Sequence, residues 1–219
     1  MNKLALFDCD GTLVDSQANI CLCMERTFDR SGIARPARAA IRRLVGLSLA
    51  EVIAELVPEA SDKLQRSLVD GYRTMFAELR MTGAMDSEPL FDGITDTLTQ
   101  LASEGWQLGV ATGKSDRGLI RVLTDHGLIH QFITLQTADR HPSKPHPSMV
   151  QQAMAEADAS PDTTIVIGDT SFDMVMARNA GARALGVNWG YHPSNELEAA
   201  GAFAIAKHPC DIFELMGAK

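Results

Sequence analysis

Short apolar runs alternate with helical patterns along most of the chain. The runs are apolar at nearly every position, which is typical of strands covered on both faces in a parallel sheet. They predict strands at residues 4–7, 106–112, 132–136, 164–168, 182–187 and 202–206. Between the runs lie helical patterns such as residues 94–103 and 172–180, which are followed by Gly105 and Gly181, and glycine is favoured after a helix C-terminus. The alternation predicts a doubly wound α/β fold with a mainly parallel, Rossmann-like sheet.

One stretch, residues 16–81, has no strand pattern and repeats its apolar residues at helical spacing. An insert of about 65 residues is too long for a simple loop between a strand and a helix. We therefore expect a helical cap subdomain at residues 16–82, inserted into a catalytic core made of residues 1–15 and 83–219. The chain is expected to return to the core near residues 88–93.

The first predicted strand ends in a pair of carboxylates, Asp8 and Asp10. Residues two apart on a strand project in a common direction, and two neighbouring carboxylates repel each other unless a cation lies between them. Mg²⁺ would suit such a pair because it prefers oxygen ligands in octahedral geometry. A solvated acidic turn is the simpler alternative, since Asp and Gly are common in turns.

The second cluster is "VATGKS" at residues 110–115. Thr112 offers a hydroxyl group, Gly113 offers a backbone that an anion can approach, and the helix that begins nearby presents free amides. A nucleotide-binding P-loop is excluded, because it needs four residues between its two glycines and only three separate Gly109 from Gly113. An ordinary strand-to-helix turn remains the alternative.

The third cluster is the loop "HPSKPHP" at residues 141–147, which three prolines stiffen. A lysine on a rigid loop can be aimed at a fixed point, so Lys144 could balance the acidic cluster and hold a phosphate. A surface lysine in a proline-rich turn is the alternative. His141 and His146 lack partners at metal-ligand spacing and are interpreted as loop residues.

The fourth cluster is "IGDTSFD" at residues 167–173, in which Asp169 follows a buried strand and Asp173 lies four residues further on. Both could serve a metal site, although an Asp N-cap with a second acidic residue in the first helical turn would give the same pattern. The carboxyl ends of parallel strands meet at one edge of the sheet, where ligands bind. Together the four clusters supply ligands for a cation and donors for an anion, as a phosphoryl group beside Mg²⁺ requires.

Composition narrows the possible partners. The chain has 219 residues and a net charge of -8, so it would repel a nucleic acid backbone on average. No apolar run is long enough for a membrane span, and the N-terminus has no signal-peptide pattern. Four scattered cysteines, Cys9, Cys21, Cys23 and Cys210, favour a reducing compartment. We expect a cytoplasmic protein with a small anionic substrate; the oligomeric state is not predicted.

Taken in order, "DCDGTLVDS", "ATGKS", Lys144 and "GDTSFD" resemble the four motifs of the haloacid dehalogenase-like hydrolase superfamily. The helical insert and the "WGY" at residues 189–191 resemble its phosphoglycolate phosphatase-like branch, which carries a C1 cap. The resemblance implies an α/β enzyme that hydrolyses phosphate esters with the help of Mg²⁺. An aspartate at position 10 also resembles the phosphatases of the superfamily rather than its dehalogenases.

The resemblance also implies roles for single residues. Asp8 would be the nucleophile that forms an aspartyl-phosphate, and Asp10 would be the general acid and then the base. Lys144 would stabilise charge on Asp8 and on the phosphoryl oxygens. The phosphoryl group would be held by Thr112 and Gly113, and Mg²⁺ would be bound by Asp8, the Asp10 carbonyl and Asp169 with help from Asp173.

The substrate is the least determined part of this prediction. A substrate-specificity loop is expected at residues 41–48, where Arg42 or Arg43 could bind a carboxylate or a second phosphate if they are not simply on a solvated helix face. Phosphoglycolate is the default substrate for a Mg²⁺-dependent phosphatase of this type. A sugar phosphomutase or a pyrophosphatase of the same fold is the enzymatic alternative. A phospho-receiver signalling domain is disfavoured, because Asp169 follows Lys144 in the chain and the helical insert has no place in a receiver.

Overall fold

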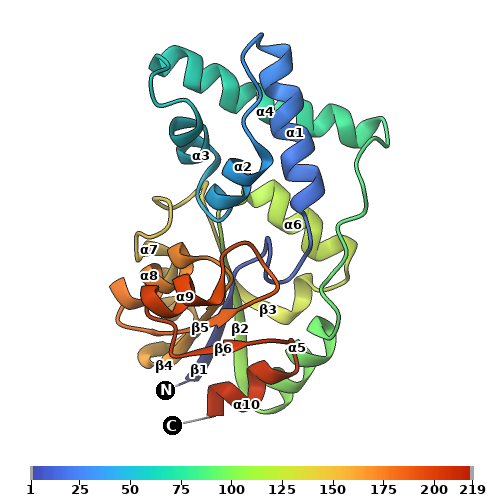
Figure 1. The fold of residues 1–219 in the computed structure, drawn as a ribbon. Coiled ribbons are helices and arrows are strands. Elements are labelled where there is room, and N and C mark those ends of the chain that lie inside the picture. The colour runs from blue at the N-terminus through green and yellow to red at the C-terminus, as the bar shows by residue number, and fades with distance from the viewer. Residues whose placement is uncertain (1, 218–219) are drawn as a thin grey trace.

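The computed structural model describes residues 2–217, and its core is a single six-stranded parallel sheet (Figure 1). The strand order is β3-β2-β1-β4-β5-β6. The strands are β1 (Asn2–Phe7), β2 (Trp106–Thr112), β3 (Phe132–Thr137), β4 (Ala159–Gly168), β5 (Arg183–Val187) and β6 (Ala204–Ala206). The predicted doubly wound α/β fold is confirmed, but four strands start elsewhere than predicted: β1 at Asn2, β4 at Ala159, β5 at Arg183 and β6 at Ala204.

Helices cover both faces of the sheet, which explains why the strands are apolar at nearly every position. Along β1, Ala5 and Phe7 face one hydrophobic cluster while Leu4 and Leu6 face the other. The first face is covered by α5 (Ile94–Ser103), α6 (Asp116–Asp125), the short 3₁₀ turn η1 (Ile129–Gln131) and α10 (Asp211–Gly217). The second face is covered by α7 (Ser148–Ala157), α8 (Ser171–Asn179) and α9 (Ser194–Ala200).

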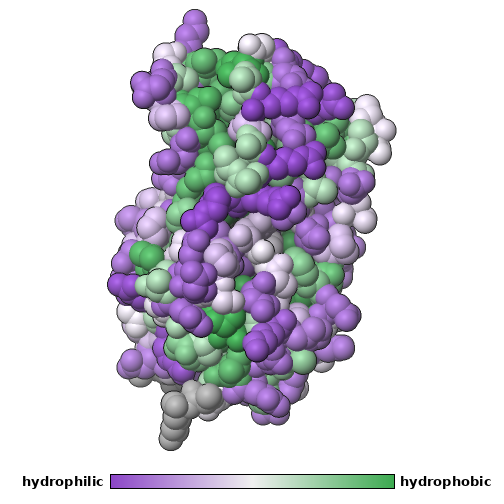
Figure 2. All heavy atoms as spheres, viewed as in Figure 1, coloured by the Kyte–Doolittle hydropathy of each residue, from purple (hydrophilic) through white to green (hydrophobic). Residues whose placement is uncertain are grey.

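Four helices form a separate layer over the carboxyl ends of the strands (Figure 1). They have their own hydrophobic cluster, which includes Met24, Phe28, Ile41 and Leu68. In Figure 2 hydrophobic residues gather on this layer above a band of hydrophilic residues at its junction with the sheet. These helices are α1 (Gln17–Arg30), α2 (Arg38–Leu44), α3 (Leu49–Leu56) and α4 (Asp62–Met81).

Two linkers lie side by side where the chain leaves and re-enters the sheet layer. Val14 and Leu90 form an antiparallel bridge. The Asp15 amide donates to the Pro89 carbonyl at 2.9 Å, and the Phe91 amide donates to the Leu13 carbonyl at 3.1 Å. From these contacts and the separate cluster we propose the division into a core of residues 1–15 and 83–219 and a cap of residues 16–82.

Residues 2–217 contain no helix long and apolar enough to cross a membrane. The four cysteines are free thiols, and three of them, Cys9, Cys21 and Cys23, are buried.

Candidate active site

Three aspartates and one lysine meet where β1 and β4 end side by side. Asp8 follows β1, Asp169 follows β4, and Asp173 lies in the first turn of α8. Ligand atoms of these three carboxylates lie within 4.8 Å of one another, and each residue is at most 1% exposed. Lys144, in the loop before α7, reaches into the cluster: its Nζ lies 2.9 Å from Asp8 Oδ1 and 2.6 Å from Asp173 Oδ1. The surface-lysine and solvated-turn alternatives therefore do not describe these residues.

Burial and charge compete in this cluster. Burial raises the pKa of Asp8 to about 7, although the attraction of Lys144 opposes the rise. Burial also raises the pKa of Asp169 well above its ordinary value, and the neighbouring Asp8 adds to the rise. For Lys144 burial alone would lower the pKa, but the charges of Asp173 and Asp8 outweigh it and raise the pKa above its usual range. The structure thus holds a charged lysine among carboxylates that a further cation would relieve.

The donor set fits a divalent metal ion such as Mg²⁺. Asp8 Oδ2 is buried and has no hydrogen-bond partner among the described residues, so it is available as a ligand. Asp169 is held in place from two sides: the Thr12 hydroxyl donates to Oδ1 at 2.8 Å and the Tyr191 amide donates to Oδ2 at 2.9 Å. Carboxylate oxygens fixed in this way are the hard ligands that Mg²⁺ prefers.

Two glycines allow this close packing around Asp169. Gly11 has a φ of +82°, and a Cβ atom there would lie 2.3 Å from Asp169 Oδ2. A Cβ atom on Gly190 would lie 2.2 Å from the Asp169 side chain. The "DGT" turn and the "WGY" segment therefore meet at this carboxylate, and Trp189 Nε1 donates to the Thr12 carbonyl at 3.2 Å. The contacts of Thr12 and Tyr191 were not predicted, because they join residues far apart in sequence.

Asp173 has both of its oxygens engaged by protein groups. Lys144 occupies Oδ1, while the Thr170 amide and hydroxyl donate to Oδ2 at 3.1 and 2.7 Å. These last contacts form a capping box in which Thr170, and not Asp169, is the N-cap of α8. Asp173 thus holds the start of α8 and the Lys144 side chain, and the N-cap alternative for Asp169 is not what the structure contains.

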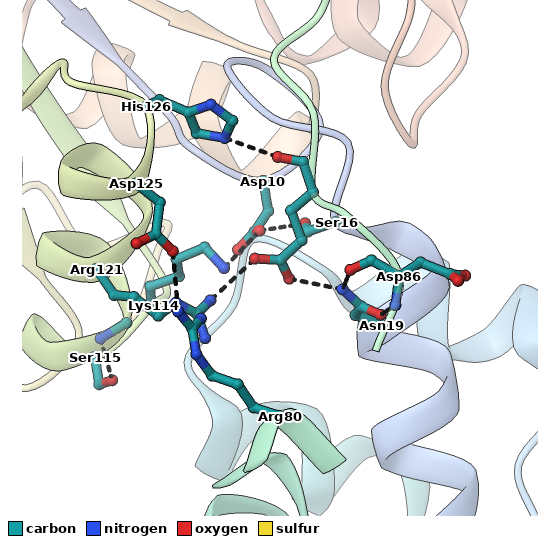
Figure 3. A network of polar contacts seen from close by, with 12 residues as sticks. Asp10, Ser16, Asn19, Arg80, Asp86, Lys114, Ser115, Arg121, Asp125 and His126 are labelled. Atoms are coloured by element: carbon teal, nitrogen blue, oxygen red, sulfur yellow. Dashed lines mark hydrogen bonds and ion pairs between the residues drawn. The ribbon is translucent and has the colours of Figure 1, made fainter. Parts of the chain in front are cut away.

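Asp10 is not part of this group of three carboxylates, and its side chain lies beside Lys114 and Ser16 (Figure 3). Its Oδ1 forms an ion pair with Lys114 Nζ at 2.8 Å and accepts a hydrogen bond from Ser16. The strand rule that would align Asp10 with Asp8 does not hold here, because β1 ends at Phe7 and the chain turns at Gly11. Burial alone would lower the pKa of Lys114, but the charge of Asp10 raises it. Lys114 lies within the quoted "ATGKS" motif, yet its contact with Asp10 was not predicted.

Thr112 ends β2 and Gly113 follows it, on the other side of β1 from Asp169. Thr112 is buried, and its hydroxyl accepts from the Lys114 amide at 3.3 Å. A Cβ atom on Gly113 would lie 2.3 Å from the carbonyl oxygen of Leu47 and 2.8 Å from that of Gly46. The cap loop between α2 and α3 therefore rests on the glycine backbone at the end of β2.

Gly113→Ala tests this close approach. The new Cβ would displace the cap loop, and a shift of about 1 Å near reacting groups can cost a hundredfold in rate. We expect the rate of the reaction at this site to fall by about that factor. Gly71→Ala, in α4, is the matched control. Its Cβ would lie 3.4 Å from Thr27 Cγ2 of α1, which is an ordinary van der Waals contact. Equal activity of both variants would show that the contact is not needed.

Arg42 and Arg43 lie on α2, but neither lines the cavity beside Asp10. Arg43 Nη1 pairs with Glu196 Oε2 at 2.6 Å, at the start of α9. His192 Nε2 lies 3.1 Å from the Arg43 carbonyl, and the Ser171 amide donates to His192 Nδ1 at 3.1 Å. Arg43 and His192 thus join the cap to the core, and substrate binding by Arg42 or Arg43 stays a prediction.

The chain is similar to several known proteins. The family model for haloacid dehalogenase-like hydrolase matches residues 5–187. A protein from Dickeya dadantii named "Probable phosphatase IndB" is 34% identical over 91% of this chain and 87% of its own length. A phosphoglycolate phosphatase from Nitrosococcus oceani is 28% identical over 87% of this chain and 85% of its own. A solved haloacid dehalogenase-like hydrolase from Streptococcus pneumoniae matches with a TM-score of 0.84 and 27% identity, covering 98% of both chains.

The chain therefore belongs to the haloacid dehalogenase-like hydrolase family, in the branch that resembles phosphoglycolate phosphatases. The prediction of an enzyme of the phosphatase type is confirmed at the level of the family.

Proposed function

We propose that this hydrolase is a Mg²⁺-dependent phosphatase that cleaves small phosphate monoesters through an aspartyl-phosphate on Asp8, with phosphoglycolate as its reference substrate. The observation that supports this most is that neither buried oxygen of Asp8 accepts a hydrogen bond, which leaves one oxygen for a metal ion and one for attack, beside the charged Lys144. A carboxylate that lacks a hydrogen-bond donor keeps a free lone pair for attack on phosphorus.

In the first step, Asp8 would attack the phosphorus while the bond to the leaving oxygen breaks. Asp10, which Lys114 and Ser16 hold in place, is the proposed donor of the proton that the leaving alcohol needs. Lys144 would stabilise negative charge on the phosphoryl oxygens. Amides at the end of β2, next to Thr112 and Gly113, would orient the group.

In the second step, a water molecule would attack the phosphorus of the aspartyl-phosphate. Asp10 would take the proton from this water, and Asp8 would leave as a carboxylate together with free phosphate. A metal ion, when bound, would be held by Asp8, Asp169 and the Asp10 carbonyl and would neutralise charge on the phosphoryl group.

Four free thiols support a reducing compartment, for which we propose the cytoplasm.

A phosphate-release screen tests the proposal. Phosphoglycolate, sugar phosphates and pyrophosphate are each incubated with the protein with Mg²⁺ and with EDTA. We expect release of phosphate from monoesters with Mg²⁺, and loss of nearly all of it in EDTA. Interconversion of sugar phosphates without net release would instead indicate a mutase. Release from pyrophosphate alone would indicate a pyrophosphatase, and release that persists in EDTA would contradict the metal requirement.

A further inference from the structure

A cavity of about 630 Å³ lies between the cap and the core, and Asp10 and Gly113 line one end of it. The cap is docked onto the core around this cavity: the Ser48 amide donates to Ser143 Oγ at 2.8 Å, and Arg43 pairs with Glu196. The volume therefore belongs to a state in which the cap is in contact with the core, not to a widely open one.

The volume is far larger than a glycolate leaving group needs. A two-carbon hydroxy acid occupies on the order of 100 Å³, a few times the volume of about 30 Å³ that one water takes in the liquid. Cavities of roughly 300–1,000 Å³ are typical of sites for drug-sized ligands. Glycolate would leave most of this space to water.

The cap side of the cavity is apolar. Half-buried side chains from four cap segments face it, and these are Ile20, Leu47, Leu49, Tyr72, Phe76 and Ala77. Partly exposed apolar residues gathered around one cavity gain free energy when an apolar ligand covers them, at about 25 cal/mol per Å². A small polar leaving group would not supply that cover.

The lining of the cavity also carries cations, from the core and from α4, although the chain as a whole has a charge of -8. Five cations line the cavity against two carboxylates, Asp10 and Asp139; the cations are Arg73, Arg80, Lys114, Arg117 and Arg121. Most of them have acidic partners: Lys114 pairs with Asp10, Arg80 with Asp125 and Arg121 with Glu88 (Figure 3).

Arg117 is the exception. It is exposed, and it has no hydrogen bond or ion pair among the described residues. A cation without a partner at the rim of a substrate cavity is available to an anionic group on the ligand.

We propose that the leaving group of the natural substrate is a bulky apolar alcohol that carries an anionic group, with its body against the cap wall and its anion near Arg117. This inference rests on the proposed phosphatase function, because it assumes that the phosphoryl group lies beside Asp8 and Asp10. It assigns a substrate class larger than phosphoglycolate.

Three phosphate esters test the apolar body and the anionic group of the proposed leaving group separately. Phosphoglycolate has the anion without the body, 2-phenylethyl phosphate has the body without the anion, and the phosphate ester of 3-phenyllactate has both. One extra methylene in a fitting pocket is worth about tenfold or more. We therefore expect kcat/KM for the phenyllactate ester to exceed that for phosphoglycolate by at least about tenfold. An equal or higher value for phosphoglycolate would overturn the proposal.

Two variants locate the contacts. Ala77→Phe fills part of the cavity from α4, and Thr74→Phe places the same side chain at an exposed position of α4 that does not line it. We expect Ala77→Phe to lower kcat/KM for both phenyl esters and not for phosphoglycolate, and Thr74→Phe to change none of them. A uniform loss with Ala77→Phe would overturn the assignment of the cap wall.

Arg117→Gln tests the anionic contact, with the exposed Arg66 of α4 changed to Gln as the control. A solvent-exposed ion pair is worth up to about fivefold in binding. We expect Arg117→Gln to lower kcat/KM for the phenyllactate ester by that factor and to leave 2-phenylethyl phosphate unchanged. Equal loss with both esters would remove Arg117 from this role.

Binding of phosphonates distinguishes a failure of the proposed phosphatase function from a failure of the proposed substrate class. In 3-phosphonopropanoate and 2-benzyl-3-phosphonopropanoate a methylene replaces the ester oxygen, so neither can be hydrolysed, and calorimetry gives their Kd. Tighter binding of the benzyl compound without turnover of any ester would support the pocket and refute the phosphatase. Turnover of all esters with no preference in rate or Kd would refute the substrate class alone.

Discussion

Asp8→Asn is expected to lower phosphate release by at least about a thousandfold at saturating Mg²⁺. An amide cannot form the acyl-phosphate, and removal of a nucleophile leaves only the rate that binding and charge stabilisation supply. The measurement is phosphate release by purified protein. Asp162→Asn, at an exposed position near the start of β4, is the control and should keep full activity. Activity that survives Asp8→Asn would contradict the proposed covalent step.

The same substitution should stabilise the protein in EDTA. Asp8 is fully buried, and burial raises its pKa to about 7, so its ionised form is less favourable in the folded than in the unfolded chain. Asparagine has nearly the same shape and carries no charge. We therefore expect Asp8→Asn to melt at a higher temperature than the wild-type protein at pH 8 without metal, and Mg²⁺ to raise the Tm of the wild type more than that of the variant.

The pH dependence of this difference follows from linkage. A raised pKa means that the folded chain binds the proton more tightly than the unfolded chain, so wild-type stability is lost as pH rises through the folded pKa. The advantage of Asp8→Asn in EDTA should thus be full above about pH 7 and should vanish by about pH 4, where Asp8 is protonated in both states. A difference in Tm that does not change with pH would show that the charge of Asp8 is not its cause.

The sequence predicts the elements and the chemistry of the site because both depend on short-range rules. Runs apolar at nearly every position follow from helices on both faces of the sheet, as Leu4 and Ala5 show by facing opposite clusters. Asp8 and Asp169 could be expected to meet, because they follow strands that end at one edge of a parallel sheet. The two aspartates meet only if their strands are neighbours in the sheet, and β1 and β4 are neighbours.

What the sequence does not reveal depends on contacts between distant segments. Lys114 reaches Asp10, and Tyr191 fixes Asp169, across separations that no local pattern encodes. The sequence shows the charge of Arg43, but it does not show that Glu196, far along the chain, forms an ion pair with it. The cavity is likewise a product of packing, since its apolar wall comes from several cap helices whose spacing resembles that of any amphipathic helix.

Lys144→Met is expected to have the largest effect on stability. Its side chain is fully buried and forms ion pairs with Asp8 and Asp173. Removing one partner of a buried ion pair typically costs about 3–5 kcal/mol, because the remaining charge has no compensation. Here the three carboxylates within 4.8 Å of one another would lose their buried lysine. We expect a loss of that size in the free energy of unfolding, measured by urea titration at pH 8 in EDTA.

The direction of the pKa shift of Lys144 explains why the unfolding is measured at pH 8. Burial would lower the pKa of Lys144, but its carboxylate partners raise it overall, so the stability it contributes is fully present below the pKa of an unfolded lysine, about 10.4. At pH 8 the lysine is charged in both states. Lys63→Met, at an exposed position of α4, is the matched control and should stay within about 0.5 kcal/mol of the wild type.

A double variant decides whether the loss arises in the cluster. With Asn at position 8 the lysine has one carboxylate fewer to balance, so Lys144→Met should cost less in that background than in the wild type. Residues in one ion-pair network deviate from additivity by about 0.5–3 kcal/mol, which urea titration resolves. Strict additivity would mean that Lys144 and Asp8 do not interact energetically, and the proposed charge balance between these two residues would then have to be abandoned.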